Sequence, residues 1–154
     1  MFKIEAMKEI ERKFLVKDFS VIQDCPFDII QQSYLFNETT KSLRVRIKND
    51  RAFLTIKGNL VGITRDEFEY QIPKQEAIEI IEKFGLKILS KKRYYKEIDG
   101  LKWEIDVFEG SLSGLFIAEI ELPDENFNFK LPDWIGKEVT FDKNYFNAEL
   151  IKKL

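Results

Sequence analysis

Alternation of apolar and polar residues is the main feature of this sequence, and it predicts a protein built mostly from β-strands. Over residues 43–47, Leu, Val and Ile alternate with Arg44 and Arg46 without a break, which is the period of a strand with one apolar and one polar face. The same period predicts strands over residues 9–16, 31–36, 43–47, 52–57, 65–72, 90–98, 101–109 and 115–122. Because short turns separate most of these segments, we expect the strands to be largely antiparallel.

The period changes to that of a helix after Pro73. Apolar residues recur at helical spacing from Ala77 to Phe84, and Gly85 follows, which predicts one long helix over residues 74–84. This helix should pack its apolar stripe on the apolar side of the sheet.

Other segments give weaker signals. We expect residues 1–8 to be a lead-in, residues 18–24 to form a short helix, and Asp142 to cap a final helix over residues 143–153. The pair Asp99-Gly100 predicts a hairpin turn, and Trp134 is expected to anchor the core.

The polar faces of the predicted strands are unusual because they carry paired like charges. Glu9, Glu11 and Lys13 project from one face of the first strand, since alternate side chains of a strand point the same way. Corresponding positions on later strands are Arg44, Arg46, Lys57, Glu67, Glu69, Lys91, Arg93, Glu104, Asp106, Glu119 and Glu121. Like charges so close repel unless something compensates them. A solvated face with local ion pairs is one explanation; the interpretation we favour is that these faces line one enclosed cavity.

Length and net charge narrow the class of protein. A chain of 154 residues fits one domain, which we place at residues 1–154. The net charge of -2 gives no global field for nucleic acid or an anionic membrane, so neither is expected as a partner. The single cysteine, Cys25, cannot form an internal disulfide, and no opening apolar run is typical of a signal peptide or membrane span. We therefore expect a cytoplasmic protein.

The absence of histidine removes several kinds of active site. Ser-His and Cys-His nucleophile pairs are excluded, and so are the imidazole ligands that zinc usually takes. Metal chemistry would have to use carboxylate oxygens, which suit Mg²⁺ or Mn²⁺. Arginine and lysine on the same faces match a phosphate-rich anion, and a divalent cation would reconcile that anion with the nearby carboxylates. Together these features predict a phosphoryl-transfer site.

Several short motifs of the sequence resemble those of a known protein superfamily. Glu9-Ile-Glu-Arg-Lys13 resembles the ExExK signature of the CYTH superfamily, the triphosphate tunnel metalloenzymes. Further segments resemble the short bacterial inorganic triphosphatases of this superfamily in order along nearly the whole chain, and they begin at Tyr34, Leu43, Phe53, Arg65, Lys91, Trp103, Ala118 and Tyr145. The signature alone would be weak, whereas the ordered set is specific.

The resemblance implies an α+β fold that is mainly antiparallel β: an eight-stranded closed β-barrel, or triphosphate tunnel, with helices packed outside. It implies metal-dependent hydrolysis of a triphosphate, most specifically inorganic tripolyphosphate to pyrophosphate and phosphate. By the same resemblance, the phosphate-binding residues are Lys13, Arg44, Arg46, Lys57, Lys91 and Arg93. The implied ligands of Mg²⁺ or Mn²⁺ are Glu9, Glu11, Asp106, Glu119 and Glu121.

The remaining roles are less specific. The resemblance implies that Glu67, Glu69 and Glu104 line the tunnel; we group the first two with the substrate-binding residues and the third with the metal ligands. Tyr34 and Lys91 occupy the positions of a pair proposed to help activate water in similar triphosphatases. Water activated by metal and carboxylate is the simpler alternative.

Three other functions share the same triphosphate clamp. They are an adenylate cyclase, a thiamine or nucleoside triphosphatase, and a non-catalytic polyphosphate-binding module. A cyclase must also hold adenine and aim the ribose hydroxyl, and no separate stretch of this sequence supplies those contacts. A homodimer is an expectation by family analogy alone.

Overall fold

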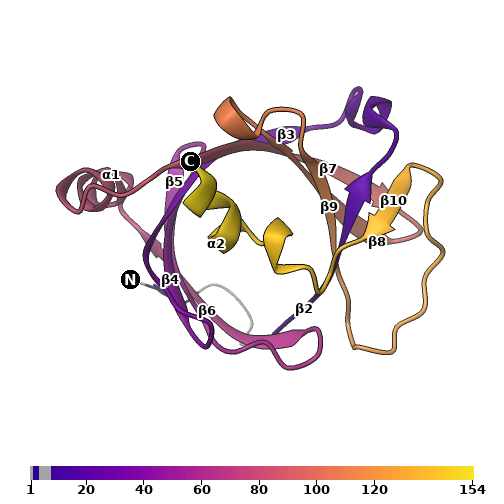
Figure 1. Cartoon of the computed structure of the whole chain (residues 1–154), viewed down its shortest axis with the longest axis horizontal. Helices are drawn as coiled ribbons and strands as arrows, with labels where there is room; N and C mark the ends of the chain where they lie inside the picture. Colours follow the sequence, from indigo (N-terminus) through magenta and orange to yellow (C-terminus); the bar gives the residue numbers. More distant parts are fainter. Residues whose placement is uncertain (1, 4–7) are drawn as a thin grey trace.

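The strands of this protein close into a barrel, which Figure 1 shows as a ring. The computed structural model describes residues 2, 3 and 8–154. Its strands are β1 (Phe2–Lys3), β2 (Lys8–Val16), β3 (Phe27–Asn37), β4 (Ser42–Lys48), β5 (Arg51–Lys57), β6 (Thr64–Ile72), β7 (Leu89–Ile98), β8 (Leu101–Phe108), β9 (Phe116–Glu121) and β10 (Ile135–Glu138). Its helices are α1 (Lys74–Lys83) and α2 (Asn147–Leu150), with 3₁₀ turns η1 (Phe19–Ile22), η2 (Gly110–Leu112), η3 (Lys143–Tyr145) and η4 (Ile151–Lys153).

Eight strands make the barrel, in the order β6-β5-β4-β3-β7-β8-β9-β2, and every pairing is antiparallel. The ring closes where residues 8–10 of β2 pair with residues 64–66 of β6. Farther along β2, Phe14 and Val16 pair instead with β10, and β1 lies beside β6. This arrangement confirms the predicted eight-stranded antiparallel barrel and adds two short strands at its seam.

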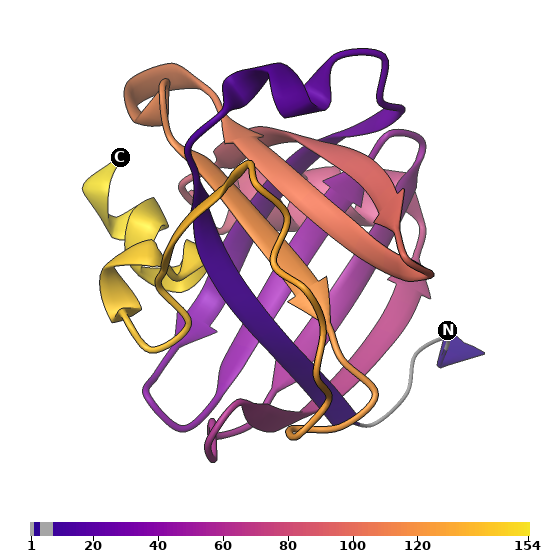
Figure 2. The same ribbon diagram turned by 90° about the vertical axis from the view of Figure 1, so that its right-hand side faces the viewer.

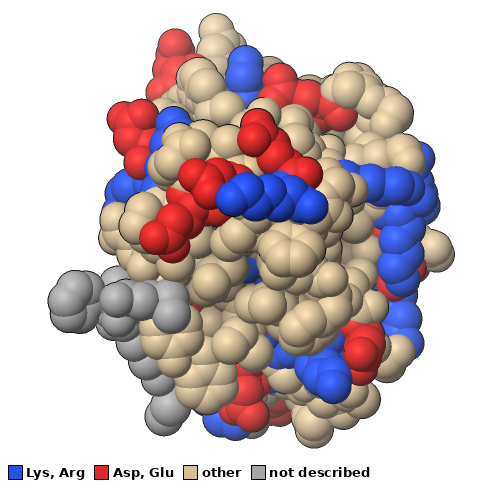
Figure 3. Space-filling model, turned by 90° about the vertical axis from the view of Figure 1, so that its left-hand side faces the viewer, with Lys and Arg blue, Asp and Glu red and all other residues tan. Residues whose placement is uncertain are grey.

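Helix α1 and the loop that follows β9 cover apolar side chains on the outside of the barrel. Helix α1 buries Ala77 and Ile81 against Val45 and its neighbours on β4 to β6, as the helical spacing predicts. The face that carries α1 mixes acidic and basic side chains without a field of one sign (Figure 3). The loop that follows β9 runs over another side of the barrel (Figure 2). Its residues Phe129 and Trp134 pack against Trp103. The expectation that Trp134 anchors the core is confirmed.

The C-terminal segment, residues 143–153, lies across one end of the barrel (Figures 1 and 2). Leu150 and Ile151 are buried there against Leu89, Phe108 and Ile117, so apolar side chains close this end. The prediction of one continuous helix over residues 143–153 is wrong. Asp142 does cap the first turn, but Phe146 adopts an extended conformation that separates η3 from α2, and α2 then continues directly into the 3₁₀ turn η4.

Several predicted boundaries also change. Strand β3 starts at Phe27 instead of residue 31, and the helix expected over residues 18–24 is the single turn η1. The lead-in contains β1, while residues 1 and 4–7 lie outside the described part. Strand β10 was not predicted, because its four residues include Gly136 and show no alternation. Among the described residues, no helix has the length and apolar character needed to cross a bilayer.

Candidate functional site

The inner faces of the barrel surround a cavity of about 430 Å³. Most of the side chains predicted for the site line it: Glu9, Glu11, Lys13, Tyr34, Arg44, Arg46, Lys57, Glu67, Glu69, Arg93, Glu104, Glu119 and Glu121. The charged columns therefore face one enclosed space, as the alternation of each strand predicts. Lys91 and Asp106 do not line this cavity, because they are fully buried in the wall beneath it.

At several positions the strand register brings opposite charges together. Lys13 of β2 lies opposite Glu119 of β9, with Nζ 3.1 Å from the carboxylate. Lys57 of β5 lies opposite Glu67 of β6, with Nζ 3.0 Å from the carboxylate. Such cross-strand pairs compensate much of the repulsion between like charges along each strand.

Glu9 is held by two cations. Its carboxylate is 2.8 Å from Lys57 Nζ and 2.8 Å from Arg65 Nε. Burial favours the neutral acid, but the charges of Lys57 and Arg65 outweigh it and lower the pKa of Glu9 well below its usual value. This carboxylate is therefore ionised at neutral pH.

The wall beneath the cavity contains a buried ion cluster. Asp106 accepts hydrogen bonds from Lys91 Nζ at 2.6 Å and from Arg93 Nε and Nη2 at 2.7 and 2.8 Å. Burial opposes ionisation of Asp106, but Arg93 and Lys91 lower its pKa and keep it charged. Burial lowers the pKa of Lys91 by more than the Asp106 carboxylate raises it, so the net shift is downward. Lys91 also donates to Asn147 Oδ1 at 2.9 Å, which ties the C-terminal segment to this cluster.

Glu11 stands in a different environment from its neighbours. Its closest cation is Lys13, at 3.9 Å, and that lysine is closer to Glu119. Burial, and then the charges of Glu119 and Glu9, raise the pKa of Glu11 to about 8. Glu119 itself is paired with Lys13 and Arg93, which lower its pKa to about 2 despite burial. Glu11 is thus a partly buried carboxyl group, with its side chain 21% exposed, whose ionised form a cation would stabilise.

The cavity wall that carries Glu9 and Glu11 offers carboxylate ligands, which suit a hard divalent cation. Glu9 and Glu11 come from β2, and Glu121 lies opposite Glu11 in register, so carboxylate oxygens are the available ligands. Within residues 2–3 and 8–154, no three acidic, His or Cys side chains are already gathered as a metal-binding cluster. A metal ion would therefore need some of its ligands from water or from a bound anion.

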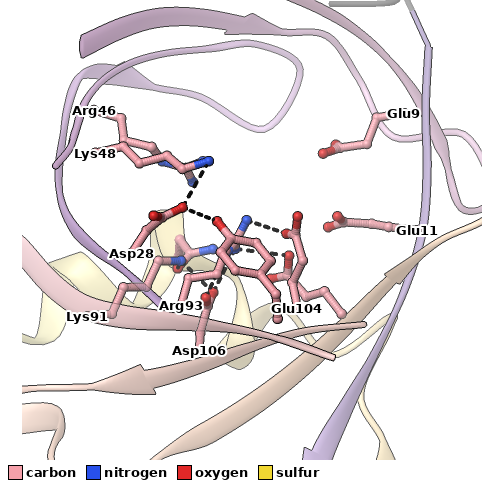
Figure 4. Close-up of polar contacts among 12 residues, drawn as sticks. Glu9, Glu11, Asp28, Arg46, Lys48, Lys91, Arg93, Glu104 and Asp106 are labelled. Carbon is pink, nitrogen blue, oxygen red and sulfur yellow. Dashed lines mark hydrogen bonds and ion pairs between the residues drawn. The ribbon is translucent and has the colours of Figure 1, made fainter. Parts of the chain in front are cut away.

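The opposite wall is basic. Figure 4 shows Arg46 and Lys48 across the cavity from Glu9 and Glu11. Arg46 donates from Nε to Gln32 Oε1 at 3.0 Å, and no described carboxylate lies within ion-pair distance of it. Burial, then the charges of Arg44 and Arg93, lower the pKa of Arg46 to about 10. Arg46 is still charged at neutral pH, so this wall offers an uncompensated cation.

The structure adds cavity residues that the sequence reasoning did not assign. Lys48, Arg65 and Lys102 each stand two positions from an assigned residue of the same strand, so strict alternation could have found them. Phe146 and Asn147 also line the cavity but belong to the C-terminal segment. No periodicity points to that pair, because their position depends on how this segment crosses the barrel end.

Tyr34 and Lys91, the predicted water-activating pair, lie in different environments. Tyr34 lines the cavity and packs beside Leu89 and Leu150. Lys91 is fully buried and engaged with Asp106 and Asn147. Only Tyr34 of this pair reaches the cavity surface.

Comparison with known proteins gives a consistent set of relatives. The CYTH domain family model matches residues 7–152. An inorganic triphosphatase of Acetivibrio thermocellus is 49% identical over 146 residues, which cover 94% of each chain. A putative adenylate cyclase of Methanocaldococcus jannaschii is 32% identical over 82% of this chain and 73% of its own. A crystal structure of an inorganic triphosphatase has a TM-score of 0.67 at 34% identity, covering 93% of this chain and 97% of that one.

Proposed function

The chain belongs to the CYTH domain family, and from that premise we propose that it hydrolyses inorganic tripolyphosphate to pyrophosphate and phosphate with a divalent metal ion. The observation that carries the proposal is the polarity of the cavity. One wall presents Arg46 without a carboxylate partner, and the facing wall presents Glu11 without a close cation. A triphosphate with a bound cation satisfies both walls at once.

The basic residues of the cavity would bind the phosphate oxygens. We assign this role to Lys13, Arg44, Arg46, Lys57 and Arg93, which all line the cavity. Arginine can hold two oxygens of one phosphate, which fixes the substrate's orientation. Glu67 and Glu69 pair with Lys57 and Arg44 and would keep these cations in place. Fixed cations also stabilise the charge that develops as the phosphoanhydride bond breaks.

The acidic wall would hold the metal. We assign Glu9, Glu11, Glu119 and Glu121 as ligands, directly or through water, with Mg²⁺ or Mn²⁺ as the candidate ions. When bound, such an ion would offset the repulsion between these carboxylates and the substrate and would lower the pKa of a water molecule in the site. Glu104 and Asp106 both bind Arg93, so we give them the indirect role of positioning that guanidinium.

Hydrolysis requires water to attack the terminal phosphorus while the bond to the pyrophosphate leaving group breaks. Tyr34 is the candidate for orienting that water, because its side chain lines the cavity. Lys91 has a supporting role in this scheme, since it is buried behind the wall and holds Asp106 and Asn147.

The cavity surface favours an inorganic substrate over a nucleotide. Its apolar side chains are few, and they include Leu60, Ile63 and Phe146. A base-binding cyclase needs a larger apolar surface beside the triphosphate clamp.

A substrate panel tests the proposal. Purified protein is incubated with tripolyphosphate, ATP or thiamine triphosphate, each with Mg²⁺ or Mn²⁺, and the products are separated by ion-exchange chromatography. We expect equal amounts of phosphate and pyrophosphate, with tripolyphosphate as the fastest substrate. Cyclic AMP as the main product from ATP would establish a cyclase instead. Tight binding of tripolyphosphate without phosphate release would establish a binding module.

A further inference from the structure

Arg46 differs from most other cations that line the cavity in what holds it. Lys13, Arg44, Lys57 and Arg93 each have a carboxylate within ion-pair distance. Arg46 has instead a neutral partner, the side-chain amide of Gln32, which accepts from its Nε at 3.0 Å. The two terminal nitrogens of Arg46 make no hydrogen bond to the described part of the chain.

The position of Gln32 suits this contact. It lies directly opposite Arg46 in the β3–β4 register and is fully buried. The amide orientation follows from chemistry, because arginine only donates and Oε1 must therefore face it. The amide nitrogen Nε2 is then left buried without an acceptor. An unpaired buried donor destabilises a fold, and such features are typical of functional sites.

A neutral acceptor has a specific advantage at this place. A carboxylate beside Arg46 would orient the guanidinium but would also cancel its charge and compete with phosphate oxygens. The amide oxygen restricts the same side chain while leaving its charge and both terminal nitrogens available. A pre-oriented guanidinium loses less conformational freedom when the anion binds.

We propose that Gln32 is a positioning residue that orients Arg46 toward the terminal or central phosphate of the substrate without neutralising it. This inference rests on the proposed function, because it assumes that Arg46 binds phosphate.

Gln31 provides a matched control. It is the adjacent residue with the same side chain, but it is exposed, because neighbouring residues of β3 point to opposite faces. The test compares Gln32→Glu and Gln32→Met with Gln31→Glu and Gln31→Met. Each variant is measured for kcat and KM with tripolyphosphate, for melting temperature, and for pyrophosphate affinity by calorimetry, which needs no turnover.

We expect Gln32→Glu to keep or raise the melting temperature, because it adds an ion pair with Arg46. Its KM should nevertheless rise at least about tenfold, with a smaller change in kcat, as follows from losing one charge-assisted phosphate contact. Gln32→Met should weaken binding through lost orientation. If Gln32 acts only through Arg46, the double variant with Gln32→Met and Arg46→Met should have the same kcat/KM as Arg46→Met alone. Both Gln31 variants should match the wild type.

The outcomes separate this inference from the proposed function. An active wild type whose Gln32→Glu variant keeps its KM and pyrophosphate affinity overturns the role of Gln32 alone. Independent, multiplicative effects of Gln32→Met and Arg46→Met on kcat/KM overturn it as well. If Gln32→Met does not fold, the glutamate variant decides the question. A wild type that neither binds nor hydrolyses tripolyphosphate overturns the proposed function, and this inference with it.

Discussion

Arg46→Met is expected to make the protein more stable and less active at the same time. The pKa of Arg46 is lowered to about 10 by burial and by Arg44 and Arg93. The usual arginine value is about 12.5, and one pKa unit corresponds to about 1.4 kcal/mol, so holding this charge in the cavity wall costs on the order of 3 kcal/mol. The loss of the hydrogen bond to Gln32 offsets about 1–2 kcal/mol of the gain on removing the charge.

The net gain is therefore about 1–2 kcal/mol in the free energy of unfolding. For a chain of 154 residues this corresponds to a rise in melting temperature of about 2–8 °C. The folded state binds the Arg46 proton less tightly than the unfolded state does. The destabilisation is therefore fully present below pH 10 and is lost as the pH rises through about 10 toward the unfolded value.

Activity should change in the opposite direction. Losing a charge-assisted contact to phosphate removes about 1.5–3 kcal/mol of transition-state stabilisation, so kcat/KM for tripolyphosphate should fall by roughly 10- to 100-fold. The assays are phosphate release and thermal unfolding without substrate, at pH 7 and above pH 10. Arg51→Met is the control, because Arg51 also donates to a glutamine, Gln71, but on the exposed surface. A melting temperature that falls at pH 7, or unchanged kcat/KM, would refute this account of Arg46.

Three further predictions address the metal, the acidic wall and the fold. Chelation with EDTA should abolish tripolyphosphate hydrolysis and Mg²⁺ or Mn²⁺ should restore it; activity that survives chelation contradicts the assignment of a metal to the carboxylates. The pKa of Glu11 is raised to about 8, so folding at pH 7 requires this carboxyl to take up a proton. Glu11→Gln removes that cost, so the metal-free melting temperature should rise and its further increase with Mg²⁺ should shrink, whereas the exposed Glu97→Gln should change neither. Gly100→Ala should lower the free energy of unfolding by about 1 kcal/mol, because Gly100 has a φ of +75°, which strains a residue with a Cβ atom. Gly58→Ala places its Cβ at ordinary contact distances, so the free energy of unfolding should hardly change; chemical denaturation measures both.

The barrel and the direction of most site residues could be predicted from the sequence, because a strand has only two faces. Once Leu43, Val45 and Ile47 are placed outside, Arg44 and Arg46 must point inward, and the same reasoning holds for each charged strand. The fold class and the family resemblance depended on this repeated pattern.

The depth of each side chain in the wall could not be predicted. Alternation places Asp106 and Glu104 on one face, yet Asp106 is fully buried beneath the cavity and Glu104 reaches its surface. The difference depends on the stagger between neighbouring strands, which no single strand encodes. Likewise, the break at Phe146 follows from the path of the C-terminal segment over the barrel end, a through-space effect that helix propensity does not report.

The pairing of β2 has a consequence for how the chain is made. Residues 8–10 close the barrel against β6, and residues 11–15 pair with β9, whose residues are translated much later. During synthesis on the ribosome, residues 11–15 of β2 therefore stay without their β9 partner until most of the domain has emerged. The sequence of β2 is suited to that interval, because charged residues along an open strand discourage pairing with other nascent chains. We therefore expect the side chains proposed to serve the reaction also to reduce aggregation of the emerging polypeptide.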